Sequence, residues 1–176
     1  TSVDYDPTLV GSIEFFKRVQ NKVHWAITGK TAAEIIHSRA NSEKDNMGLI
    51  TFRGSKVRKQ DVVNAKNYLN EEELLALNNL VEQYLVFAEG QAMRRISMTM
   101  VNWVEKLDGF LTLNDRNILD HAGKVTHQLA KQFSEQEYDK FKQQGLLDEA
   151  KAADARDFEQ LTKITDQLEK PKDEKG

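Results

Sequence analysis

The stretch AITGKTAAEII, residues 26–36, decides between two folds. Its Gly-Lys-Thr tripeptide is the core of a P-loop, which follows a strand and needs another glycine five residues before Gly29. That position is His24, and the residues in front of Gly29 have the spacing of an amphipathic helix. The sequence therefore predicts a corner between two helices, where Gly29 ends the first and a Thr31–Glu34 capping box starts the second.

Composition favours one soluble domain with a hydrophobic core, because 39% of the 176 residues are apolar and 30% are charged. The two prolines, Pro7 and Pro171, lie near the ends and leave the interior open to helix. No apolar run is long enough for a membrane span, and no signal peptide is visible. Cysteine is absent, which excludes disulfides and thiolate chemistry. We therefore expect a cytoplasmic protein, and the start at Thr1 suggests a piece of a longer chain.

Apolar periodicity predicts a mainly α, compact multi-helix domain of about six or seven helices. The main predicted helices cover about residues 12–27, 32–40, 70–88, 99–111, 126–141 and 146–170, with shorter helical segments at 60–69 and 116–121. Ser12, Asn70 and Thr126 read as N-terminal caps, and Asn70 forms a capping box with Glu73. Apolar residues such as Ile13, Phe16, Val81 and Leu85 belong to the stripes that we expect in the core.

Two segments depart from this pattern. Residues 48–58 contain a short β-prone run followed by Arg-Gly-Ser, which predicts a small β-hairpin or an ordered loop. After Gly145 the chain is rich in charged residues and keeps only a narrow apolar seam, formed by Leu147, Ala150, Phe158, Leu161, Ile164 and Leu168. We expect a helical core over 1–145 and, in the same domain, a long polar helix with a frayed tail over 146–176.

Five basic residues are the strongest candidates for binding phosphate or nucleic acid. They are Lys30, Arg53, Lys56, Arg58 and Lys59. Residues 22–66 carry nine Lys/Arg against four Asp/Glu, a surplus of five positive charges, and residues 135–176 carry eight against twelve, a surplus of four negative charges. The basic region can attract phosphates, contact a partner's acidic surface or the acidic tail, or simply be solvated.

Among the four histidines, His24 and His37 are the candidates for proton transfer, and a packed or hydrogen-bonded imidazole is the competing interpretation. No two histidines have the i, i+4 spacing of helical metal ligands, so no metal site and no cofactor is predicted.

Several blocks, read together, resemble the virulence-associated RhuM family of bacterial proteins. They are YDPT (5–8), FFKRVQNKVHWAITGKTAAEII (15–36), NMGL (46–49), GSKVRKQDVVNAKNYLNEEEL (54–74) and WVEKLDGFL (103–111). The resemblance spans about residues 4–141 and implies the C-terminal domain of a longer protein, in which a segment resembling a winged-helix DNA-binding domain precedes this region. The family is often named with Fic/Doc proteins, but their His-Pro-Phe signature is absent, so no Fic/Doc activity is implied.

Two functions from different classes follow. The first is a non-enzymatic effector or assembly module of a DNA-associated bacterial protein, which contacts a partner or forms a homo-oligomer through its C-terminal helix. The alternative is a domain that binds or processes a nucleotide or nucleic acid through the basic loop, with His24 or His37 transferring protons. Neither involves a membrane.

Overall fold

The structure is a computed structural model that describes residues 2–8 and 10–169, with the side chains of the last helix described through residue 163. Its elements are α1 (Val10–Thr28), α2 (Ala32–Arg39), the 3-10 turns η1 (Asp45–Gly48) and η2 (Ala65–Tyr68), α3 (Glu71–Met93), α4 (Met100–Leu113) and α5 (His127–Glu169). The chain divides into two compact units, Thr1–Tyr138 and Asp139–Gly176. The mainly α prediction is confirmed.

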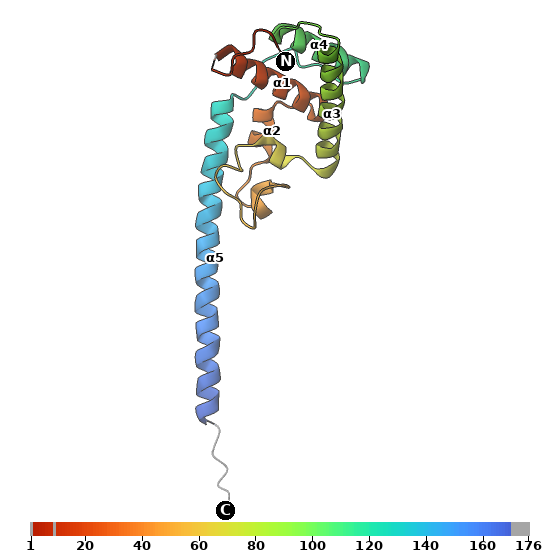
Figure 1. Cartoon of the computed structure of the whole chain (residues 1–176). Coiled ribbons are helices and arrows are strands. Elements are labelled where there is room, and N and C mark those ends of the chain that lie inside the picture. The colour runs from red at the N-terminus through yellow and green to blue at the C-terminus, as the bar shows by residue number, and fades with distance from the viewer. Residues whose placement is uncertain (1, 9, 170–176) are drawn as a thin grey trace, which may run out of the picture. The chain divides into compact units, whose positions relative to one another are not determined.

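The Gly-Lys-Thr stretch is the predicted corner between α1 and α2 (Figure 1). Gly29 has a positive φ of 66°, and its N–H donates to the Trp25 carbonyl over 2.8 Å, which ends α1. The Thr31 side chain accepts from the Glu34 N–H, and the Glu34 carboxylate accepts from the Thr31 N–H, so the predicted capping box is complete. A helix precedes the tripeptide, which excludes the P-loop geometry.

The second predicted capping box, Asn70–Glu73, starts α3 and also links it to α2. Arg39 donates to both carboxylate oxygens of Glu73 over 2.6 Å and to the Tyr68 carbonyl over 2.7 Å. A bidentate guanidinium–carboxylate pair of this kind fixes orientation as well as distance. The Arg39 hydrogen bonds hold the pKa of Glu73 below its usual value.

Helix α1 is the centre of the first unit and packs against α2, α3 and α4, while α2 packs against η2. The largest fully buried side chains are Tyr68, Ile35, Ile36, Met47, Leu69, Leu107 and Leu111. Each buried leucine or isoleucine contributes about 1.5–3 kcal/mol of transfer free energy. Burial raises the pKa of Tyr68, whose hydroxyl donates to the Val62 carbonyl over 2.8 Å.

Residues 48–58 form the ordered loop of the prediction and not the hairpin. In the described chain no strand occurs, and the β pairing is an isolated bridge between Ser2 and Met98. The N–H groups of Ile50 and Thr51 both donate to the Asn67 carbonyl, which anchors the loop to η2 without a strand partner. Hydrogen bonds to Asn67 therefore take the place of the strand pairing that the β-prone residues suggested.

The number of helices was predicted slightly too high, since the described residues form five α-helices and two 3-10 turns. Residues 60–69 contain only the η2 turn, and residues 116–121 are not helical. Asp115 has a positive φ of 55°, which turns the chain away after α4. In addition, α1 starts at Val10, so Ser12 is a buried residue inside the helix and not its cap.

The expected helices at 126–141 and 146–170 are one continuous helix, α5. At its start the Leu129 N–H donates a hydrogen bond to the Thr126 hydroxyl. Because α5 runs through residue 145, the predicted division there stays a prediction. The side chains of Ile164 and Leu168, and the tail at 170–176, lie outside the described part of the chain.

A buried histidine makes stability depend on pH. His24 is only 3% exposed, and burial, followed by the nearby Lys66 charge, lowers its pKa to about 4. The unfolded chain has an ordinary histidine pKa of about 6.5. Between about pH 6.5 and pH 4 it therefore binds a proton at His24 that the folded chain does not bind. We expect the free energy of unfolding to fall by about 3 kcal/mol between pH 7 and pH 4 from this group. Urea titrations across that range measure it.

The His24→Leu variant is the control for this dependence. It should keep its stability between pH 6.5 and pH 5 while the original chain loses stability. If both chains lose stability in parallel, His24 is not the responsible group.

A second prediction concerns the loop after α4, which approaches the α1–α2 corner. Gly123 has φ of 83°, and a Cβ there would lie 2.8 Å from Thr31 Cγ2. Because both the conformation and the contact oppose a side chain, Gly123→Ala should lower the free energy of unfolding by about 1–3 kcal/mol. Gly109→Ala, inside α4 with nothing within 4 Å, should be neutral or stabilising. Urea denaturation compares the two, and equal stabilities would contradict the close approach.

Candidate functional site

The two histidine candidates lie in different environments. His24 is buried, and its Nδ1 has no hydrogen-bond partner among the described residues. His37 is exposed, and its ring contacts the Phe133 ring at a centroid distance of 4.6 Å. Phe133 can neither accept nor donate a proton, and His24 Nδ1 has no partner among the described residues, so a proton-transfer role for either histidine stays a prediction.

The structure connects two of the five basic candidates directly. Arg58 donates through Nη2 to the Arg53 carbonyl over 2.9 Å, and its Nε lies 4.0 Å from Asp61. Lys59 lies 3.8 Å from the Glu135 carboxylate, and Lys30 donates to the Ser38 hydroxyl over 3.0 Å.

Lys30 therefore belongs to the α1–α2 corner, while Arg53, Lys56, Arg58 and Lys59 belong to the basic loop. The Lys30 ammonium donates to Ser38 of α2, outside that loop. Within the same part of the chain, no group of three His, Asp or Glu side chains could hold a metal ion.

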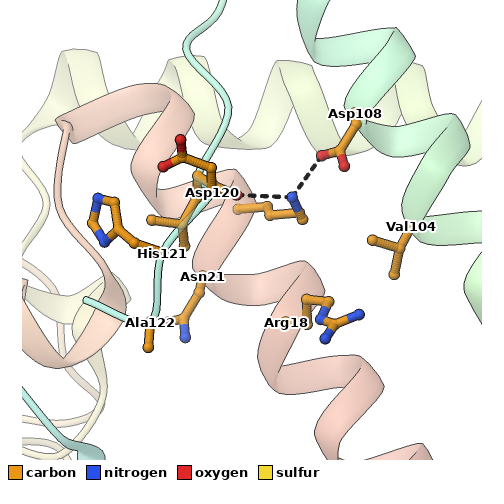
Figure 2. Close-up of a pocket in the computed structure, with 9 residues that line it drawn as sticks. Arg18, Asn21, Val104, Asp108, Asp120, His121 and Ala122 are labelled. Atoms are coloured by element: carbon orange, nitrogen blue, oxygen red, sulfur yellow. Dashed lines mark hydrogen bonds and ion pairs between the residues drawn. The ribbon is translucent and has the colours of Figure 1, made fainter.

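One polar cavity was not predicted from the sequence. It is a cleft of about 580 Å³ between α1, α4 and the loop after α4 (Figure 2), and we call it the polar cleft. The residues that line it are Arg18, Asn21, Lys22, Val104, Asp108, Leu119, Asp120, His121 and Ala122. Its charged residues come from three separate segments, which sequence spacing alone does not bring together.

A buried ammonium forms the floor of the polar cleft. Lys22 is 7% exposed, and its Nζ lies 2.7 Å from Asp108 Oδ1 and donates to the Leu119 carbonyl over 2.9 Å (Figure 2). Asp108 Oδ1 accepts no directed hydrogen bond, so this contact is a Coulombic pair.

The Asp108 charge also acts on Tyr84 of α3. Burial, and then the Asp108 charge, raise the pKa of Tyr84 to about 12.

The lining of the polar cleft also contains two charged side chains, Arg18 and Asp120. Among the described residues, neither the Arg18 guanidinium nor the Asp120 carboxylate has a hydrogen bond or ion pair. Arg18 comes from α1 and Asp120 from the loop after α4 (Figure 2). Within the described part of the chain, the cleft therefore offers a cation and an anion that have no partner of their own.

The loop that covers the polar cleft is held against the Gly-Lys-Thr corner. The His121 ring contacts the Trp25 ring edge-on at 4.7 Å, and His121 Nδ1 accepts from the Gly123 N–H. Glu34 accepts from the Lys124 N–H over 2.7 Å. Burial raises the pKa of Glu34, but the hydrogen bonds from Lys124 and Thr31 outweigh it, so the net pKa is lowered.

The C-terminal part of α5 presents a different kind of surface. Every side chain from 142 to 163 is exposed, and we call these residues the exposed segment. Four of them are large apolar residues: Leu146, Leu147, Phe158 and Leu161, exposed by 56–73%. No helix in the described chain is long and apolar enough to cross a membrane, so α5 is not a membrane span.

Comparison with known proteins gives one match. No curated protein and no solved structure matches the chain. The model of the Virulence protein RhuM family matches residues 1–149, which cover the whole helical core and the beginning of the exposed segment. This agrees with the sequence blocks around the Gly-Lys-Thr corner and the start of α3, and the chain therefore belongs to the Virulence protein RhuM family.

Proposed function

We propose that the chain is a non-enzymatic assembly module of a bacterial, virulence-associated and DNA-associated protein, and that it acts in the cytoplasm. Two copies associate by pairing their exposed segments. The observation that carries this proposal is that residues 142–163 form more than five turns of helix in which every side chain is exposed. A helix of this kind is not stabilised by a core of its own, and pairing with another helix buries its apolar residues.

The apolar side chains of the exposed segment have the spacing of a seam. Leu147 and Leu161 are two heptads apart, Ala150 follows Leu147 by three residues, and Phe158 precedes Leu161 by three. These positions share one face of a helix. Asp154 and Asp157 stand one heptad after Leu147 and Ala150, so two polar residues interrupt the seam and select its register at a cost in stability.

The charges of the exposed segment permit association of identical copies. It contains four basic and five acidic residues, which leaves a net charge of −1. Two copies therefore repel each other weakly, while the interspersed signs allow ion pairs at the flanks of the seam. Burial of each leucine or phenylalanine contributes about 1.5–3 kcal/mol, which favours a reversible dimer.

A second candidate function, phosphate or nucleic-acid binding, rests on the basic loop. The Arg53 guanidinium is exposed and has no partner among the described residues, while its backbone carbonyl is held by Arg58. A free guanidinium on a braced backbone is well placed for a phosphate. Lys56 is also exposed, and Lys59 contributes additional positive charge.

The assembly proposal predicts the effect of charges placed in the seam. The full chain should form a dimer whose proportion rises with concentration in light scattering coupled to size exclusion. Leu147→Glu together with Leu161→Glu should weaken dimerisation at least tenfold, since two apolar contacts worth more than about 1.4 kcal/mol are lost. Leu113→Glu is the matched control, because Leu113 is 82% exposed but lies at the end of α4. A chain that stays monomeric at every concentration would sink the proposal.

The nucleic-acid candidate predicts a salt-dependent affinity. Binding of the full chain to a fluorescent duplex should weaken linearly in log–log form as salt rises, and Arg53→Gln should reduce the slope by about one. Arg94→Gln, an exposed arginine at the end of α3, is the control that should leave the slope unchanged. No binding at low salt, or equal slopes for both variants, would count against the basic loop.

A further inference from the structure

A second cavity, between α1 and α3, differs in character from the polar cleft. It has a volume of about 570 Å³, and we call it the apolar cleft. It is lined by Phe16, Val19, Gln20, Val23 and His24 of α1, by Leu77, Asn78, Val81, Glu82 and Leu85 of α3, and by Asn64 and Lys66 before α3. Ligand sites in proteins are typically clefts of this size with apolar walls and a few placed polar groups.

The walls of the apolar cleft are only partly covered by the fold. Val23 and Leu77 are buried at its floor, whereas Phe16 and Leu85 are 55% and 62% exposed. Val81 is 39% exposed. Since the apolar periodicity placed these residues in the core, their exposure leaves an apolar surface that gains free energy when it is covered.

One end of the apolar cleft is polar and positively charged. Lys66 donates through Nζ to the Asn78 side chain over 3.3 Å, which orients the ammonium and leaves two N–H donors for another acceptor. His24 lies at the same end, close enough for its pKa to respond to Lys66, and its buried Nδ1 lacks a partner. At neutral pH this imidazole is uncharged, so Lys66 supplies the only positive charge of the lining.

We propose that the apolar cleft binds a small molecule with an apolar body and one carboxylate head, whose body lies along Val81 and Leu85 and whose head binds Lys66. Along α3, Asn78 and Leu85 are seven residues apart, or about 10 Å, which suits a medium-length alkyl chain. A single ammonium beside an amide matches one carboxylate, whereas a phosphate is usually held by several cations or by a guanidinium fork. Glu82 in the lining disfavours an anionic head farther along the cleft.

The test uses decanoate as the probe and the full chain. Titration calorimetry should show saturable binding at sub-millimolar concentration. Decan-1-ol and acetate, which lack the head and the body respectively, should bind at least tenfold more weakly. In the imidazole NMR spectrum, the His24 signals should shift as decanoate saturates, while those of the exposed His127 stay in place.

Matched variants separate the head from the body. Lys66→Met should weaken decanoate binding at least tenfold and leave decanol unchanged, and Lys106→Met, on α4, should affect neither. Leu85→Asp should abolish binding, while Leu75→Asp should not, because Leu75 is equally exposed on the same helix but lies outside the cleft. Circular dichroism checks that the variants fold.

Three results would overturn the proposal. They are no decanoate binding at millimolar concentration, equal affinity for decanoate and decanol, or unshifted His24 signals at saturation. Association of chains that Leu85→Asp abolishes, without any decanoate binding, would show that a second copy covers this surface. Since these outcomes do not involve the exposed segment of α5, they are independent of the assembly proposal.

Discussion

The buried ammonium of Lys22 is the contact on which the arrangement of the first unit depends. Removing a charge from water costs several kcal/mol, and the cost is met only if partners surround the ion. Here Asp108 comes from α4 and the Leu119 carbonyl from the loop after it, so one side chain of α1 holds two other segments in place. Removing either charged partner would leave the other buried without compensation, so this ion pair ties α4 to α1.

Around this contact, α1 separates two surfaces of opposite character. Arg18, Asn21 and Lys22 line the polar cleft, while Phe16, Val19 and Val23 line the apolar cleft. These sets interleave along the helix because neighbouring residues point about 100° apart. One helix can therefore be a core element, a wall for charged groups and a wall for an apolar ligand.

Sequence reasoning succeeded where a few neighbouring residues determine the structure. The Thr31–Glu34 and Asn70–Glu73 capping boxes are local hydrogen-bond motifs, and both are present. It failed where distant contacts decide. Residues 116–121 have helical spacing, but the loop is held instead by contacts to Trp25, Glu34 and Lys22. Periodicity marked Phe16 and Leu85 as apolar-face residues but could not tell which half of that face the fold covers. The polar cleft was not predicted because its residues come from three segments that are distant in the sequence.

The proposed surfaces respond to solution conditions in different ways, because different forces act on them. A seam of leucine and phenylalanine in α5 depends on apolar burial, so added salt should weaken it little. Contacts between the basic loop and phosphates release counterions and weaken steeply with salt. The apolar cleft combines both forces. Added salt should change its apolar contacts little, but it screens the attraction between Lys66 and a carboxylate. The exposed segment lies in the second compact unit and the apolar cleft in the first, so a substitution in one of these two proposed surfaces leaves the residues of the other unchanged.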